Sequence, residues 1–236
     1  MGKSKDLATG NSAAYVETAG DTMTGRLTIS GATVNYATSP ILQFNTTGTN
    51  TDNRNWAIGP VDDYYGNFHI FRSQSQSDSD AVDAAGRSLT ITKEGYVKKP
   101  NTPCFGARGY SGTTTQIGSY NPMLWVNVHT NVGNCFSNST GKFTFPVSGR
   151  YYVECNINLK TSDGSWLGLY FLYNTSAQMN SWSEGITGSQ YNNTIVSGVI
   201  DAAANDYCAF CWHNSYIAPA GSSHPTYNYA NIYFIG

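Results

Sequence analysis

Charged residues are scarce in this chain of 236 residues. Asp, Glu, Lys and Arg together make up 12% of the sequence, which is about half of their usual share in soluble domains. The formal net charge is −2, and no run of basic residues occurs. Because a nucleic-acid partner requires clustered Lys and Arg to neutralise its phosphates, the sequence predicts no nucleic-acid binding.

Long apolar runs are also missing. No stretch reaches the length of a membrane-spanning helix, so we expect no membrane insertion. Residues 1–20 contain no continuous apolar core, and a secretory signal peptide is therefore not predicted. If the protein acts outside the cell, this absence favours release by a route such as lysis.

Cysteines are few and odd in number. The five cysteines are spread along the chain, whereas a disulfide framework usually has an even, clustered set. We therefore expect buried free thiols in a β core made in the cytosol. Cys208 and Cys211 form a C-x-x-C pair, but residues three apart on a strand point to opposite faces. This spacing favours two core thiols over a zinc or redox site.

Recognisable catalytic motifs are absent. The sequence has no H-E-x-x-H and no G-x-S-x-G, and none of its four histidines has an acid and a nucleophile at a familiar spacing. No D-x-D run indicates calcium in the C-terminal half, so we predict no enzyme, no cofactor and no metal site. A triad assembled across the fold and a paired-carboxylate glycosidase site remain alternatives that no spacing favours. The carboxylates of the C-terminal half are Glu154, Asp163, Glu184, Asp201 and Asp206.

Tyrosine and glycine are abundant instead, with 17 and 24 copies, and Asn, Ser and Thr are frequent. Aromatic and β-branched residues suit strands, while Gly, Asn and Ser suit turns. This composition is typical of a β-rich extracellular or virion protein, and we predict an all-β fold.

The clearest strand pattern lies in the stretch Asn131–Val153 and continues to residue 159. Between Gly141 and Gly149, the side chains at 143, 145 and 147 are predicted to share one face, and Pro146 predicts a strand that ends there or lies at an edge. In the following strand, five side chains alternate with polar ones over nine residues and face one way. They are Tyr151, Val153, Cys155, Ile157 and Leu159.

The same stretch resembles the signature of the complement-one-q globular head, a tumour-necrosis-factor-like jelly roll. Residues 105–107, 197–200, 205–207 and 232–235 resemble further strands and turns of that family. The resemblance covers residues 103–236 and implies a jelly-roll β-sandwich built around a threefold axis. The positions that match are Asn131, Gly133, Phe136, Thr140, Gly141, Phe143, Pro146, Val147, Gly149 and Tyr151.

Two stretches predicted as strands, residues 167–173 and 229–235, are apolar on both faces. A lone sandwich leaves one face of each sheet polar, and each large side chain left in water forgoes about 1.5–3 kcal/mol of burial. Together with the threefold axis that the resemblance implies, this pattern predicts an obligate homotrimer.

Residues 20–30, G-D-T-M-T-G-R-L-T-I-S, resemble a short repeat of bacteriophage tail fibres, with an ordinary β-hairpin as the alternative. The preceding residues, 1–20, are small and polar, and a short helix is expected from Asn11 or Ser12 to Glu17. We predict that this segment attaches to phage tail or baseplate proteins, with a disordered terminus as the alternative. Its apolar anchors are Leu7, Tyr15 and Val16.

Short strands are predicted at residues 55–59 and 67–72, and a hairpin is predicted to join 89–92 to 95–97. Residues 73–80, S-Q-S-Q-S-D-S-D, are predicted to be a solvated loop. The strand pattern resembles phage fibre shafts, and a linker follows at 98–101. We therefore divide the chain into an attachment segment at 1–20, a β-rich trimeric shaft at 21–99 and a jelly-roll head at 100–236.

Aromatic residues lie in Gly-, Ser- and Asn-rich stretches of the predicted head, which we interpret as loops. Aromatic faces beside amide and hydroxyl groups suit sugar rings. The alternative is that these rings plug the ends of the sandwich or the trimer seam. The candidate ligand-binding residues are Trp166, Trp182, Tyr191, Tyr216, His224 and Tyr227.

The sequence thus favours a bacteriophage tail-fibre protein, made in the host cytoplasm and carried on the virion. Its trimeric head is expected to bind a bacterial surface glycan or protein receptor, with several weak sites acting together. The alternatives are a collar, head or side fibre whose jelly roll only caps the trimer, a glycan-depolymerising fibre enzyme, and a non-viral complement-like lectin.

Overall fold

The computed structural model describes residues 41–45, 50–60, 66–75, 86–160, 166–184, 191–213 and 227–236. Within these ranges the chain forms strands and turns but no helix, which confirms the predicted all-β fold. The chain divides into two compact units between Lys98 and Lys99. We call these the N-terminal unit and the C-terminal unit. The predicted attachment segment and the phage-like repeat lie outside the described residues.

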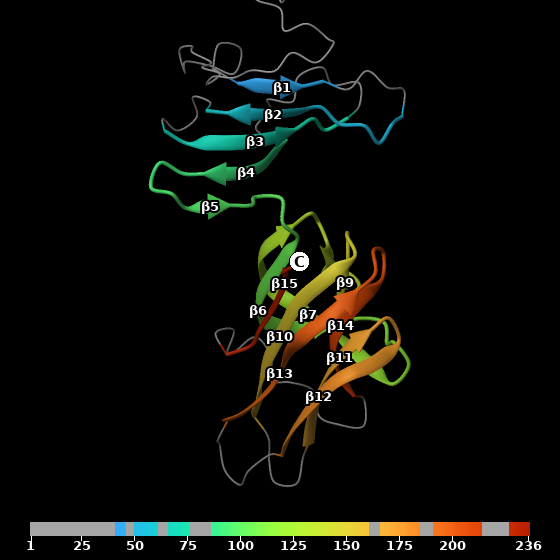
Figure 1. Cartoon of the computed structure of the whole chain (residues 1–236). Coiled ribbons are helices and arrows are strands. Elements are labelled where there is room, and N and C mark those ends of the chain that lie inside the picture. Colours follow the sequence, from blue (N-terminus) through green and yellow to red (C-terminus); the bar gives the residue numbers. More distant parts are fainter. Residues whose placement is uncertain are drawn as a thin grey trace, which may run out of the picture. The chain divides into compact units, whose positions relative to one another are not determined.

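The N-terminal unit contains one antiparallel sheet whose five strands follow chain order (Figure 1). The strands are β1 (Leu42–Phe44), β2 (Trp56–Gly59), β3 (Phe68–Arg72), β4 (Arg87–Ile91) and β5 (Val97–Lys98). The predicted strands at 55–59 and 67–72 and the hairpin before residue 98 are confirmed. A tight turn closes that hairpin, because the Gly95 N–H donates to the Thr92 carbonyl over 2.8 Å.

The solvated loop predicted from residue 73 is wrong at its first residue. Ser73 is fully buried. Its hydroxyl oxygen accepts the Asn55 N–H over 2.9 Å, and its own N–H donates to the Asn55 carbonyl over 2.8 Å. Ser73 thus continues the pairing of β3 with the start of β2, so a small polar residue is buried without an unmet hydrogen bond.

The C-terminal unit contains ten strands in two layers (Figure 1). One layer has the order β6-β15-β10-β13 and the other the order β12-β11-β14, and β7 pairs with both β6 and β14. The small strand β9 pairs with β8 and β14. The strands are β6 (Cys104–Thr113), β7 (Tyr120–Val132), β8 (Phe136–Ser137), β9 (Lys142–Thr144), β10 (Gly149–Lys160), β11 (Trp166–Tyr173), β12 (Ser176–Glu184), β13 (Tyr191–Ala202), β14 (Tyr207–His213) and β15 (Tyr229–Phe234).

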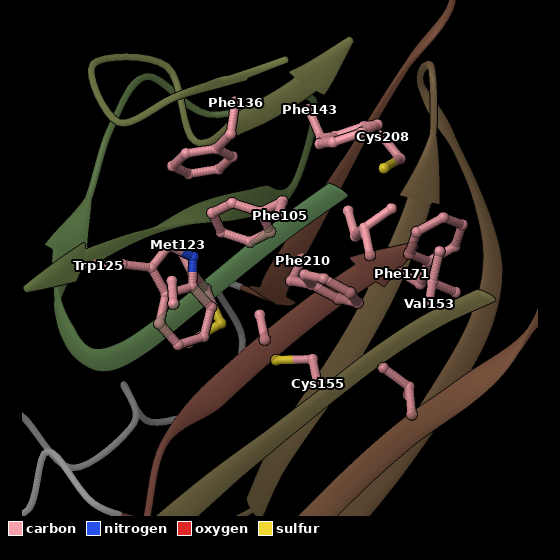
Figure 2. Packing of buried hydrophobic residues seen from close by; sticks show 14 of the residues in the cluster. Phe105, Met123, Trp125, Phe136, Phe143, Val153, Cys155, Phe171, Cys208 and Phe210 are labelled. Carbon is pink, nitrogen blue, oxygen red and sulfur yellow. The ribbon is translucent and has the colours of Figure 1, made fainter. Parts of the chain in front are cut away.

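An aromatic core fills the space between the layers (Figure 2). Phe105 stacks on Phe136 with ring centroids 4.1 Å apart. Phe145 meets Tyr151 edge to face at 4.7 Å, and the buried Tyr151 hydroxyl donates to the Val147 carbonyl over 2.9 Å. The predicted inward alternation on β10 is confirmed for Tyr151, Val153, Cys155 and Ile157, which are all fully buried.

Val147 does not share the buried face of Phe143 and Phe145, as the sequence predicted. It is 43% exposed, whereas the two phenylalanines are buried. The reason is that β9 ends at Thr144 and a bend follows through Pro146. Alternation of side chains applies only while the chain stays extended.

The five cysteines are free; four of them are buried, and Cys104 is partly exposed. Cys208 lies in the main core, whereas Cys211 lies in a second cluster on the other side of the same sheet. The predicted opposite orientation of this C-x-x-C pair on a strand is therefore confirmed.

The second cluster explains the two-sided apolar pattern of β11. It joins Tyr170 and Leu172 of β11 to Ala209 and Cys211 of β14. Ile117 and Tyr120, at the turn into β7, pack against it. The expectation that this strand needs a neighbouring copy as its second cover is therefore wrong, because this chain's own turn provides the cover.

Candidate functional site

Two half-exposed tryptophans lie on neighbouring strands of the layer β12-β11-β14. Trp182 of β12 is paired with Gly168 of β11, and Trp166 precedes Gly168 by two residues. Both indoles therefore project from the same side of the sheet. Their exposed fractions are 43% for Trp182 and 44% for Trp166. The sequence placed both residues in loops, whereas the structure places both on strands.

Three further rings adjoin the tryptophans: Tyr170 is buried, whereas Tyr120 and His213 are partly exposed. Tyr170 meets Trp182 edge to face, with centroids 5.5 Å apart. Tyr120 lies 4.9 Å from Tyr170 and 5.3 Å from His213, again between centroids. We call the set Trp166, Tyr170, Trp182, His213 and Tyr120 the aromatic face.

Polar groups border the aromatic face. The Trp182 Nε1–H donates to the Asn180 side-chain oxygen over 3.2 Å, and Asn180 is paired with Tyr170 across the strands. Rings fixed by their neighbours lose little conformational freedom when a ligand binds, and their faces suit apolar C–H surfaces. The aromatic face can therefore bind a ligand that combines an apolar face with polar edges.

The other candidate residues are not brought to the aromatic face. Tyr227 precedes β15, in the other layer of the sandwich. Tyr191 begins β13 in that layer, but its side chain, like Tyr216 and His224, lies outside what the structure describes. The attachment anchors Leu7, Tyr15 and Val16 also lie outside the described residues.

Sequence reasoning missed the contributions of Tyr120, Tyr170 and His213 to this surface. Each belongs to a different strand, and only the register joins them: His213 pairs with Tyr120, and Cys211 pairs with both Tyr170 and Pro122. The sequence did show that β11 is apolar on both faces, which indicated that its second face is covered. It did not show which residues of other strands lie beside that face.

A second surface lies on the outward side of the other layer. Exposed apolar side chains occur there on two strands: Ile195 and Val199 of β13 are 48% and 57% exposed, and Tyr233 of β15 is 43% exposed. Tyr152 and Glu154 of β10 face the same way between them. We call the outward residues of β6, β15, β10 and β13 the seam face.

Reactive chemistry is not indicated by the described side chains. No group of three or more His, Cys, Asp or Glu able to hold a metal ion occurs among the described residues. Burial raises the pKa of the Cys155 and Cys208 thiols well above the ordinary value and also raises that of Cys211. These thiols stay protonated and are poor nucleophiles at neutral pH. No described helix is long and apolar enough to cross a membrane.

The C1q domain family model matches residues 108–201. Among solved structures, murine APRIL at pH 8.0 is similar with 10% identity and a TM-score of 0.44, covering 56% of this chain and 98% of that chain. The globular domain of zebrafish complement 1qA protein is similar with 17% identity and a TM-score of 0.39, covering 55% of this chain and 93% of that chain. No curated protein matches.

The family match and the two-layered strand order together define the class of this unit. Residues 108–201 match the C1q domain model, and the unit that contains them is a two-layered β-sandwich, in agreement with the resemblance seen in the sequence.

Proposed function

We propose that this protein is a phage virion structural protein of the tail-fibre type, whose trimeric jelly-roll unit attaches the particle to glycans of the host surface. The observation that carries the adhesive part is the aromatic face, with two half-exposed tryptophans on adjacent strands. The phage-like repeat at residues 20–30 supports the fibre part.

The seam face supports the trimer. Ile195, Val199 and Tyr233 leave large apolar surface in water, and covering each such side chain contributes about 1.5–3 kcal/mol. In a trimer with threefold symmetry, the seam face of each subunit is covered in the same way by a neighbouring copy. The aromatic face lies on the opposite side of the sandwich, so self-association through the seam face leaves it accessible.

A sugar ring fits the chemistry of the aromatic face. Pyranoses carry apolar C–H faces, which pack on indole and phenol rings, and hydroxyl edges, which suit groups such as the Asn180 amide. A single site of this kind can be as weak as about 1 mM in Kd. Three sites on one trimer raise the effective affinity by orders of magnitude without further contacts.

The adhesive function is tested with the single variants Trp182→Ala and Trp166→Ala in the full-length protein. We expect each variant to remain trimeric by sedimentation and to lose at least tenfold in binding to host cells or to purified surface glycan. The matched control is Tyr96→Ala, which removes a 70% exposed ring of the N-terminal unit. Unchanged binding by both tryptophan variants would favour the cap alternative, in which the jelly roll only closes the trimer.

The virion assignment has its own test. The protein should co-purify with phage particles, and an antibody against it should label a fibre. Particles assembled with a chain that lacks residues 1–29 should lack this fibre yet be otherwise complete. Particles that retain the shortened protein would show that attachment resides elsewhere in the chain.

A further inference from the structure

A carboxylate at the centre of the seam face is held in place by the neighbouring strand. The Tyr229 hydroxyl of β15 donates to Glu154 Oε1 over 3.3 Å, and the Asn231 amide nitrogen donates to Glu154 Oε2 over 3.4 Å. The Tyr233 hydroxyl donates in turn to the Asn231 amide oxygen over 3.3 Å. One hydrogen-bonded network therefore orients Glu154 on the outward side of β10.

Apolar side chains lie diagonally across from Glu154 on both neighbouring strands. Val199 and Ile195 of β13 lie on either side of Ser197, which pairs with Glu154, and Tyr233 lies on β15. When another copy covers the seam face, water is removed from the carboxylate together with these side chains. A carboxylate that loses water without gaining a cation is strongly destabilising.

The described residues of this face offer few cations for that role. Arg150 is already paired with Asp201 at 3.3 Å. The His129 ring of β7, the strand beside this face, lies over Gly106, since a Cβ at that glycine would stand 2.8 Å from His129 Nε2. Arg108 of β6 is exposed and pairs across the strands with Tyr229. Within the described part of the chain, the Arg108 guanidinium has neither an ion pair nor a side-chain hydrogen bond.

Arg108 and Glu154 of one chain lie on strands separated by β15. In a threefold ring each contact is heterologous, so one part of the face meets a different part of the neighbouring copy, and the contact repeats three times. A guanidinium presents two parallel N–H donors, which match a carboxylate whose position is already fixed.

We infer that, in the trimer, the Glu154 carboxylate of one protomer pairs with the Arg108 guanidinium of the neighbouring copy. This inference rests on the trimer of the proposed function. The pair makes the seam selective for correctly placed copies, because an arrangement without it covers the Glu154 carboxylate without a cation.

Charge reversal tests the pair in the full-length protein by sedimentation equilibrium. We expect Arg108→Glu and Glu154→Arg each to raise the protein concentration at which the trimer dissociates by at least tenfold. The double variant should restore most of the loss, since both charges are exchanged. Glu94→Arg, a reversal at a half-exposed side chain of the N-terminal unit, is the control and should change nothing.

A second set of variants, in which each charge is removed rather than reversed, keeps the test decisive if a reversed charge prevents folding. Arg108→Gln, Glu154→Gln and their double variant change only the charge and part of the hydrogen bonding. If the two residues form a pair, the trimer of the double variant should be no less stable than the trimer of the more damaging single variant. Additive losses, or single variants as trimeric as the natural chain, overturn the pair. If the natural chain is itself monomeric, the proposed trimer is wrong. This result is distinct from a failure of the pair alone, in which the natural chain is trimeric.

Discussion

Two separate physical constraints require glycine at position 141, one of the positions that match the family signature. Its φ is +65°, and a Cβ built on it would lie 2.9 Å from Pro122 Cβ and 3.0 Å from the Met123 carbonyl oxygen. Glycine is therefore required twice, once for the left-handed backbone and once for the close approach of β7. Gly118 has a similar φ of +61°, but nothing lies within 4 Å of its Cβ position.

Replacing each glycine by alanine separates these two effects. Gly118→Ala should cost only the left-handed conformation, about 1 kcal/mol. Gly141→Ala should cost about 1–3 kcal/mol more, because backbone atoms of Met123 cannot move aside cheaply. Urea unfolding at equal protein concentration measures both. Equal losses would show that the close approach is relieved by a small shift of the backbone.

The buried thiols give the fold a defined sensitivity to alkaline pH. Burial raises the pKa of Cys155, Cys208 and Cys211 in the folded chain. In the unfolded chain these thiols ionise near pH 8.5. Their contribution to the free energy of unfolding is therefore complete below that pH. It is lost progressively above that pH, because only the unfolded state releases the thiol protons.

We expect the free energy of unfolding to fall between about pH 8.5 and 10, by up to about 1.4 kcal/mol per pH unit for each buried thiol. Urea unfolding across this range, under reducing conditions, measures the slope. Cys155→Ala lowers stability at every pH through its cavity, but its slope should be shallower by one thiol. A slope unchanged by this substitution would contradict the assignment.

At the scale of elements, two asparagine side chains take the place of a strand partner beside β7. The Asn131 amide accepts the Phe136 N–H and donates to the Phe136 carbonyl, both over 2.9 Å. The Asn138 amide does the same for Trp125, over 2.8 Å and 3.0 Å. Each side chain thus pairs with a backbone N–H and C=O as a neighbouring strand does, and the turn containing β8 is fixed to β7.

Asn131→Asp should weaken this connection. The aspartate keeps the bond from the Phe136 N–H, but its second oxygen faces the Phe136 carbonyl without a proton to donate. We expect a loss of about 1–3 kcal/mol in the free energy of unfolding at pH 7, measured by urea unfolding. Gln178→Glu, the same exchange of an amide for a carboxylate at an exposed position of β12, is the control. Losses of equal size in the two variants would point to general charge repulsion instead.

Strands with regular alternation, such as β10, were predictable from the sequence because each side chain's orientation follows from its neighbours in the chain. The aromatic face was only partly predictable. Trp166 and Trp182 were recognised as ligand candidates, but the polar composition of β12 resembled a loop, whereas it belongs to the edge of the sheet. Tyr120 and His213 meet through pairing between distant segments, which composition does not reveal.

Considered as a whole, the molecule has a C-terminal unit whose own core is complete. The buried members of the main cluster all come from residues 105–232, on β6, β7, β8, β9, β10, β11, β13, β14 and β15 and the turns between them. Exposed apolar side chains remain on the seam face. These two features suit a unit that folds alone and then associates.

Residues 99–236 expressed alone should therefore fold cooperatively and form a trimer. The full chain should give three times the chain mass of 25.6 kDa by native mass spectrometry, and the fragment should likewise give three times its own mass. The trimeric fragment should also compete with the full-length protein for the host surface. A fragment that is folded but monomeric at micromolar concentration would show that association depends on the N-terminal unit.

The aromatic face and the seam face share no residue, and the main core lies between them. Under the proposed function, substitutions that change the ligand of the aromatic face leave the proposed contact between copies unchanged. In evolutionary terms, the proposed recognition can then diversify quickly while the proposed assembly stays under its own, separate constraint. Protein engineering has the same freedom under this proposal, since the outer side of β11 and β12 can be randomised without altering the seam face.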